Sequence, residues 1–349
     1  MSGKLKSILY LPVLIFLMNS CNDKSENRNI KVLENSSDFE SIHSYRIDEY
    51  SLLTGATHIL LDGENFYFTN IISRAIYFTQ RPFSKFVKVG KNGQGPFEYR
   101  TPYYIFVKND TLFYSDIHHL KIKWIPLETA KKPKAPRFEY IEYACRNSGA
   151  KFVVGDKYVF VLNKTGYLLS ILDKRTGRLI KEMIETDALY DLPNIHLNGG
   201  GIVKAGNFIY ASRVAPFMIY KVRVDTREGE FELQNQFNFE HASGMIPWSD
   251  DLRHIAQNDP KDFFNTLNQI SAVSEIFLIG KDKSYLLVKL SRPGMFVYYV
   301  IDLNGTVQDI YRSKMNLICA SQDQLFFFQR IEDNPQSPFE LREFRIRSF

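Results

Sequence analysis

The residues best suited to acid–base chemistry gather in one segment, 240–272. His241, Asp250, Asp251 and His254 lie close together there, and imidazole and carboxylate groups are the usual general acids and bases of enzymes. The same residue types also cap helices and occupy solvated turns. The segment therefore supports two interpretations, acid–base groups beside a pocket or ordinary caps and turns.

The motifs of familiar catalytic and metal sites are missing from the sequence. No His-Glu-x-x-His, Cys-x-x-Cys or EF-hand pattern occurs, and no Gly-x-Ser-x-Gly elbow occurs. His118 and His119 stand at the entrance of a predicted strand, where neighbouring side chains point to opposite faces. The two imidazoles are poorly placed to share a metal ion. We expect neither a metal site nor a cofactor.

Composition indicates a strand-rich globular protein. The 349 residues are 44% hydrophobic and 24% charged, which is ordinary for a globular chain. The 28 Phe and 20 Tyr, against only two Trp, favour strands, because flat rings fit a pleated surface. The net charge of +5 is mild and no long Lys/Arg run is present. Nucleic acid is therefore not an expected partner.

The first residues have the pattern of an export signal. Lys4 and Lys6 precede the apolar segment 7–18, and Ser20 and Cys21 follow it. This order resembles a bacterial lipoprotein signal, in which cleavage precedes a cysteine that is then lipidated. The resemblance implies a signal peptide with its lipidation cysteine at 1–21 and a flexible polar tether at 22–38. An ordinary secretory leader with an incidental cysteine is the alternative.

The rest of the chain repeats in groups of short strands. From residue 57 onward, apolar or alternating runs are separated by Gly, Asp and Asn, as tight hairpins require. There are five groups of four such runs and a last group of three, each group about 40–50 residues long, a spacing typical of propeller blades. One β-sandwich rarely needs so many strands. We predict an all-β fold, a six-bladed β-propeller of four-stranded antiparallel blades.

The last group lacks an outer strand, and the N-terminal region can supply it. An alternating stretch near 43–51 precedes the first blade. We predict that it pairs with the last blade, closes the ring and removes an exposed sheet edge. The propeller then spans 39–349. Asp259 and Pro260 begin a helical pattern within 240–272, so a short helical insertion is expected between blades four and five.

The two remaining cysteines are predicted to be free thiols. Cys319 falls in the innermost strand of blade six, and Cys145 precedes blade three on the opposite side of the ring. A disulfide needs its two α-carbons within about 7 Å, which this placement does not allow.

The stretch "VGKNGQGPFEY" at 89–99 is rich in glycine but is not a phosphate-binding loop. It lacks the Gly-Lys-Ser/Thr end of a P-loop and the third glycine and following helix of a dinucleotide site. Gly93 and Gly95 allow unusual backbone angles and Pro96 fixes the direction of the chain. These residues predict a corner between blades one and two.

The same stretch resembles the signature GxxGxGPGEF/Y of bacterial six-bladed β-propeller lipoproteins related to NHL-repeat proteins. Phe97 stands where that family often has glycine. The resemblance implies an exported, often membrane-anchored propeller, and it implies no shared catalytic residues. The matching residues are Gly90, Gly93, Gly95, Pro96, Glu98 and Tyr99.

One face of the predicted propeller carries the long loops. In four-stranded blades, the loops between the second and third strands and the connections between blades lie on this same face. Every loop of the first kind contains or adjoins a basic residue or a histidine: Arg74, His118, Lys164, Arg213, Arg292 and Arg330. This set predicts an electropositive mouth for an anionic ligand, with a solvated rim as the alternative. Trp248 and His254 of the insertion complete the candidate ligand-binding set.

These patterns favour an exported, lipid-anchored ligand-binding or protein-interaction module of the cell envelope, in the periplasm or at the outer membrane. Its expected partner is an anionic glycan or an acidic patch on a protein. A carbohydrate-active or lactonase-like enzyme with acid/base residues at the channel mouth is the alternative, and a structural assembly subunit is the third hypothesis. An enzyme requires several titratable groups with perturbed pKa values in one pocket. An assembly subunit requires a large exposed apolar patch.

Overall fold

The computed structural model describes most of the chain from residue 30 onward. The described residues are 30–47, 53, 56–83, 85–93, 98–118, 120–130, 143–144, 150–163, 166–185, 199–214, 217–239, 242, 271–280, 284–292, 294–330 and 339–349. The predicted lipidation site Cys21 and most of the insertion 240–272 lie outside these ranges. Within them, no helix is both long enough and apolar enough to cross a membrane.

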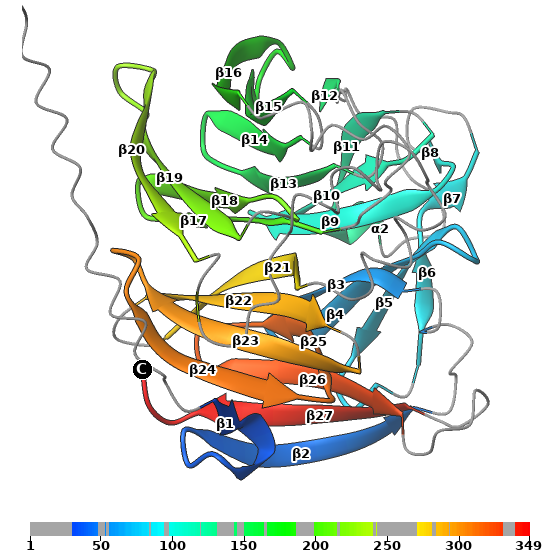
Figure 1. Cartoon of the computed structure of the whole chain (residues 1–349). Helices are drawn as coiled ribbons and strands as arrows, with labels where there is room; N and C mark the ends of the chain where they lie inside the picture. The colour runs from blue at the N-terminus through cyan, green and yellow to red at the C-terminus, as the bar shows by residue number, and fades with distance from the viewer. Residues whose placement is uncertain are drawn as a thin grey trace, which may run out of the picture.

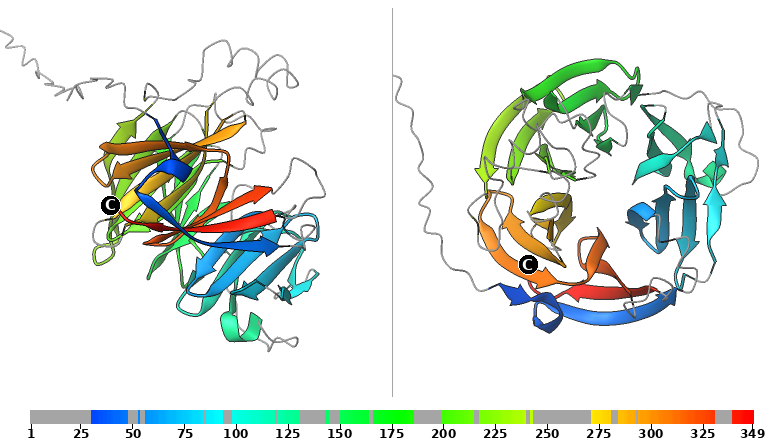
Figure 2. Two further views of the ribbon diagram at one scale, coloured as in Figure 1. Left: turned by 90° about the horizontal axis from the view of Figure 1, so that it is seen from below. Right: turned by 45° about the vertical axis from the view of Figure 1, so that its right-hand side comes forward.

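Six sheets stand around a common axis, as Figure 1 and the right-hand view of Figure 2 show. In the first blades each strand pairs antiparallel with the next along the chain. Blade one contains β3 (Ala56–Asp62), β4 (Asn65–Asn70), β5 (Ala75–Gln80) and β6 (Val87–Val89). Blade two contains β9 (Pro102–Lys108), β10 (Thr111–Asp116), β11 (Lys121–Pro126) and β12 (Tyr143–Ala144). Blade three contains β13 (Lys151–Val154), β14 (Tyr158–Leu162), β15 (Tyr167–Asp173) and β16 (Leu179–Glu185).

The second half of the ring follows the same plan. Blade four contains β17 (Gly201–Ala205), β18 (Phe208–Ser212), β19 (Met218–Asp225) and β20 (Glu230–Asn238). Blade five contains β21 (Ala272–Ile279), β22 (Tyr285–Arg292), β23 (Met295–Asp302) and β24 (Val307–Ser313). Blade six contains β25 (Asn316–Ala320), β26 (Gln324–Arg330) and β27 (Phe339–Ile346). The predicted six-bladed, all-β propeller is therefore confirmed.

The outer strand of blade two is short in the part of the chain that the structure describes. The strand that pairs with β11 is β12, through Lys121 opposite Ala144 and Ile122 opposite Tyr143. A short helix, α2 (Leu127–Ala130), follows β11.

The ring is closed by an N-terminal strand, as predicted. β2 (Phe39–Ile47) pairs antiparallel with β27, so that Phe39 lies opposite Ile346 and Ile47 opposite Phe339. The strand begins four residues before the predicted stretch near 43–51. Blade six thus receives its fourth strand, and β27 does not become an exposed edge.

An ion pair joins blade six to blade one. The Glu343 carboxylate on β27 is 1% exposed, and Arg81 Nη1 lies 3.2 Å from its Oε1. The Tyr45 hydroxyl donates to Glu343 Oε2 at 3.2 Å. A carboxylate buried to this degree is tolerated only with such partners, so the pair holds the closing blade against its neighbour.

The segment before β2 is docked on the propeller instead of forming a flexible tether as far as residue 38. β1 (Lys31–Val32) pairs parallel with β24, and the 3-10 helix η1 (Leu33–Asn35) follows it. Leu33 is 1% exposed. The Asp38 carboxylate accepts hydrogen bonds from Tyr311 Oη at 2.7 Å and Ser348 Oγ at 2.6 Å. Residues 31–38 therefore belong to the propeller, because apolar burial and hydrogen bonding fix them there.

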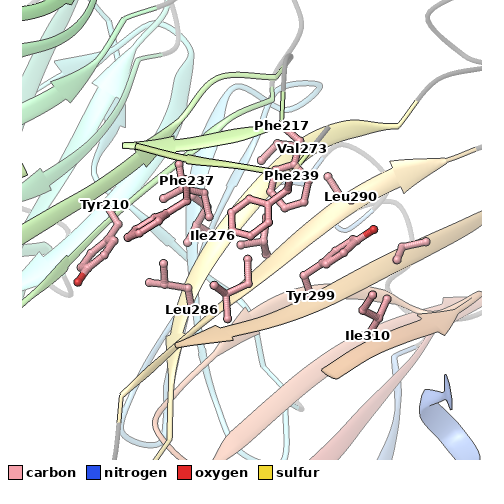
Figure 3. Close-up of a cluster of buried hydrophobic side chains, with 14 of the residues drawn as sticks. Tyr210, Phe217, Phe237, Phe239, Val273, Ile276, Leu286, Leu290, Tyr299 and Ile310 are labelled. Carbon is pink, nitrogen blue, oxygen red and sulfur yellow. The ribbon is translucent and has the colours of Figure 1, made fainter. Parts of the chain in front are cut away.

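Apolar side chains fill the spaces between neighbouring blades. Figure 3 shows one such cluster, in which Tyr210 and Phe237 of blade four lie beside Ile276 and Leu286 of blade five. Similar clusters join the other neighbours. This packing makes the ring a rigid frame, so side chains on the innermost strands face one axis from fixed positions.

Candidate functional site

The structure brings only some of the predicted rim residues to the surface. Arg74 and His118 are exposed in the loops that follow β4 and β10. Arg292 is half-buried at the end of β22. Arg213 is 9% exposed, and its Nη2 donates to the Gly166 carbonyl of blade three at 3.3 Å. Arg213 therefore links two blades and contributes little to the charge of the rim.

Several predicted residues fall outside the described part of the chain. Cys319 lies inside it, as a buried free thiol on β25, and burial raises its pKa well above the usual range. The residues outside it are Lys164, Trp248, His254, His241, Asp250, Asp251, His119, Cys145 and the side chain of Arg330.

The glycine-rich stretch forms a corner built around Tyr99. β7 (Lys91–Asn92) pairs parallel with β8 (Glu98–Tyr99). The buried Tyr99 hydroxyl donates to the Val89 carbonyl at 2.5 Å. Gly90 has φ +72°, and a side chain at Gly93 would collide with the Glu98 carboxylate. These four motif residues have structural roles, while Gly95 and Pro96 lie outside the described residues.

A cavity of about 510 Å³ opens beside blades five, six and one, and we call it the mouth cavity. The first residues of β3 and β25 and the last residues of β26 line it, so it opens on the face that carries the loops between second and third strands. This is the face on which a ligand was predicted. Its lining residues are Leu53, Ala56, Thr57, His58, Ile59, Glu275, Phe277, Lys289, Lys314, Asn316, Leu317, Ile318, Phe328 and Gln329.

A second cavity of about 240 Å³ continues along the axis, and we call it the channel cavity. The innermost strands of all six blades line it. It shares His58, Ile59, Glu275 and Phe277 with the mouth cavity, so the two spaces meet at a waist formed by these residues. Beyond the waist the lining is mainly aliphatic and aromatic, with Lys204 as its charged member.

Lys289 on β22 is the key charged group of the mouth cavity. Its Nζ donates to Asn316 Oδ1 at 2.8 Å and to the Leu317 carbonyl at 2.9 Å. Among the described residues, both hydrogen-bond partners are neutral oxygens. Burial lowers the pKa of Lys289 to about 8, because the pull of the Glu275 carboxylate does not offset the loss of water. In the described part of the chain, the ammonium thus has no carboxylate hydrogen-bonded to it.

Glu275 is paired with a different lysine. Lys151 Nζ of blade three donates to Glu275 Oε2 at 2.7 Å, and also to the carbonyls of Gly200 at 2.9 Å and Ser274 at 2.7 Å. An ammonium has three protons, and these bonds use all of them. The Lys151–Glu275 pair is therefore complete, and it ties blade three to blades four and five.

His58 stands at the waist as a neutral imidazole. Its ring lies 3.9 Å from the ring of Tyr104 between centroids, and its Nδ1 accepts the Ile105 N–H at 3.4 Å. Burial, with the charges of Lys151 and Lys289, holds its pKa well below the usual value. Because Nδ1 accepts, the proton of the neutral ring resides on Nε2, which can donate to a ligand.

The mouth cavity was not predicted residue by residue, although the sequence contains a signal for it. His58, Lys151 and Glu275 are polar residues in first strands that are otherwise mainly apolar: "THILL", "AKFVVG" and "SEIFLIG". A first strand lines the axis of a propeller, so a polar residue there faces either the channel or its mouth. Within the described ranges, no cluster of His, Cys, Asp and Glu has the arrangement of a metal site.

Known proteins resemble this chain in their fold but not in their sequence. No family model matches the sequence, and no curated protein matches it. A "putative exported protein" from Bacteroides fragilis superposes with a TM-score of 0.62 at 16% identity, covering 91% of this chain and 98% of that one. At this identity the likeness shows a shared propeller fold.

Two other structures overlap less well. AztD from Citrobacter koseri gives a TM-score of 0.44 at 8% identity, over 79% of this chain and 80% of that chain. A luciferin-regenerating enzyme gives 0.49 at 9% identity, over 87% of this chain and 95% of that chain. At these TM-scores the similarity gives no information about the residues of the site.

Proposed function

We propose that this protein is an exported β-propeller that binds an anionic ligand in the mouth cavity. One observation carries the proposal: Lys289 is a half-buried ammonium that lines a cavity and has only neutral oxygens as described hydrogen-bond partners. A charge withdrawn from water without a counter-ion costs free energy. A ligand carboxylate, sulfate or phosphate would recover that cost through a charge-assisted hydrogen bond.

The other charged residues of the mouth cavity also favour a negatively charged ligand. Lys314 is exposed at the edge of the cavity. Among the described residues, Glu275 is the one carboxylate in the lining, and it is already paired with Lys151. The neutral His58 can donate from Nε2. The acidic partner is an acidic sugar or another organic anion that enters the cavity, or an acidic side chain of a partner protein that reaches into it.

The cellular location is part of the proposal. The leader at 1–18, the Ser20–Cys21 pair and the glycine-rich signature at 90–99 together favour a lipid-anchored member of the NHL-related propellers in the periplasm or at the outer membrane. Metabolic labelling with a palmitate analogue tests the anchor. We expect the label on the unaltered chain and its loss in Cys21→Ser, and an unlabelled parent protein would contradict the anchor.

Binding is tested with matched acids and neutral analogues. The chain beginning at residue 30 is titrated calorimetrically with glucuronate against glucose and with hexanoate against hexanamide. We expect at least one acid to bind and its neutral partner to bind at least tenfold more weakly. Binding of neutral partners with equal affinity, or of no acid at all, would overturn the proposal.

A second function, acid–base catalysis at the same mouth, is favoured by the lowered pKa of Lys289. An amine with a pKa of about 8 is deprotonated in part near neutral pH and can act as a base or nucleophile. A lactonase or a carbohydrate-active enzyme is the form it would take. Hydrolysis of a lactone panel that disappears in Lys289→Met would support it. Binding of the acid without turnover of its lactone leaves the protein as a binding module.

A further inference from the structure

The lining of the mouth cavity contains two chemically different sets of residues. Lys289, Lys314, Asn316 and Gln329 come from blades five and six and present amines and amides. The second set is apolar and includes Leu53, Ile59, Phe277, Ile318 and Phe328. A sugar acid would satisfy the first set through its hydroxyl and carboxylate groups, but it would leave the second set in contact with water.

The lining of the channel cavity is also mainly apolar. Most of its lining residues are aliphatic or aromatic, and seven of them are half-buried: Leu60, Leu61, Phe106, Val203, Phe277, Leu278 and Ala320. Half-buried apolar side chains on a cavity wall are surface that a ligand can still remove from water. The charged side chain at this end, Lys204, donates to the Gly206 carbonyl of its own hairpin at 2.6 Å, so its ammonium already has an acceptor.

The waist offers apolar contacts to a chain that extends from one cavity into the other. Of the four residues that the cavities share, Ile59 and Phe277 are apolar. The other two have partners that do not depend on a ligand: Glu275 is held by Lys151, and His58 accepts the Ile105 N–H and lies against the ring of Tyr104. Passage of an alkyl chain along Ile59 and Phe277 therefore breaks none of these hydrogen bonds.

We propose that the ligand is an amphipathic monoanion, whose acidic head lies against Lys289 in the mouth cavity and whose apolar tail extends past the waist into the channel cavity. This inference rests on the proposed function, since it needs the anion site at Lys289. It adds the class of ligand, an alkyl or arylalkyl carboxylate, which neither the charge nor the fold specifies.

Alkanoates of increasing length test the tail directly on the unaltered protein. The chain from residue 30 is titrated with acetate, butyrate, hexanoate and octanoate below their micellar concentrations, and with octanamide as the neutral control. Each methylene that enters an apolar site contributes about fourfold in affinity. We expect Kd to fall stepwise along the series and octanamide to bind far more weakly than octanoate.

Three variants locate the two ends of the ligand. Lys289→Met removes the ammonium and is expected to weaken every alkanoate at least tenfold. Its matched control is Lys221→Met, because Lys221 is also half-buried, donates to the Leu303 carbonyl at 2.9 Å and lies 4.5 Å from the centroid of the Phe208 ring, away from the cavities. Ala320→Phe fills part of the channel cavity and is expected to reduce octanoate to the affinity of butyrate while acetate is unchanged.

The outcomes separate this inference from the proposed function. If the acids bind with one affinity regardless of chain length, the tail inference is wrong and the anion site stands. If neither the alkanoates nor glucuronate bind, both are wrong. If octanamide binds as tightly as octanoate, the acidic head of the ligand does not interact with Lys289 as proposed. The length series requires no variant, so a failure of Ala320→Phe to fold would not affect the test.

Discussion

Replacing Lys289 with methionine is expected to stabilise the ligand-free protein, because the native ammonium is poorly paired. Burial lowers its pKa from 10.5 to about 8. At about 1.4 kcal/mol for each pH unit, the charged form is disfavoured by about 3 kcal/mol at neutral pH. The side chain is half-buried and its cavity admits water, so screening reduces this to about 2 kcal/mol. Loss of the two hydrogen bonds, to Asn316 Oδ1 and to the Leu317 carbonyl, costs about 0.5 kcal/mol each, because water in the cavity can replace the ammonium.

The net expectation for Lys289→Met is about 1 kcal/mol of added stability. For a chain above 300 residues this corresponds to a rise in Tm of about 1.5 °C. Urea unfolding with a shared slope is the more sensitive assay. The effect of Lys289 on stability depends on pH. Its pKa is lower in the folded state than in the unfolded state, so the native lysine is destabilising below pH 8. This effect fades as the pH rises toward 10.5.

A structural lysine would behave in the opposite way. If Lys289→Met lowers the free energy of unfolding by more than 1 kcal/mol and leaves hexanoate binding unchanged, then Lys289 is a scaffold residue and the reasoning about an unpaired charge is wrong. Lys221→Met is the control, since it removes a lysine with a carbonyl acceptor outside the cavities. We expect this control to be no more stable than the parent and to bind hexanoate normally.

Three further outcomes follow from the same contacts. Affinity for an anion should be constant below pH 8 and fall above it, because Lys289 with a pKa of about 8 must be protonated to bind. Calorimetric titration at pH 6.5 and 9.5 measures the two affinities, and equal values would contradict this prediction. Leu33→Ala should lower stability by about 2–4 kcal/mol because its side chain is buried, and an unchanged Tm would mean that this segment is a free tether. Glu343→Ala should cost about 1–3 kcal/mol, since Arg81 and Tyr45 lose a buried acceptor while Arg81 keeps its ion pair with Glu64. Urea unfolding measures the loss, and a change below 1 kcal/mol would show that ring closure does not depend on the pair.

The closing strand shows how far local pattern can predict. Its alternation, together with the missing outer strand of the last blade, is enough to pair the N-terminal region with β27. The same kind of pattern places residues 31–38 in a tether, because a short polar stretch with one leucine has no periodic signal. Only the contacts of Leu33 and Asp38 with distant residues such as Tyr311 reveal that this segment is docked.

The basic residues of the rim illustrate the opposite limit. Their positions in loops predicted a shared electropositive mouth, yet Arg213 is buried against Gly166 whereas Arg74 is exposed. A loop assignment states where the backbone turns. It does not state whether a long side chain extends into water or folds back between blades, because that choice depends on the neighbouring blade.

The sequence by itself determined the strands, their turns, the number of blades and the closing strand, because alternation and turn residues act over a few neighbours. Only the tertiary structure decided the site. His58, Lys151, Glu275 and Lys289 belong to three blades and are separated by long stretches of chain. They converge because ring closure directs the inner strands at one axis. The tertiary structure pairs Glu275 with Lys151 and places Lys289 against Asn316. Lys289 is therefore the lysine that we propose for the ligand.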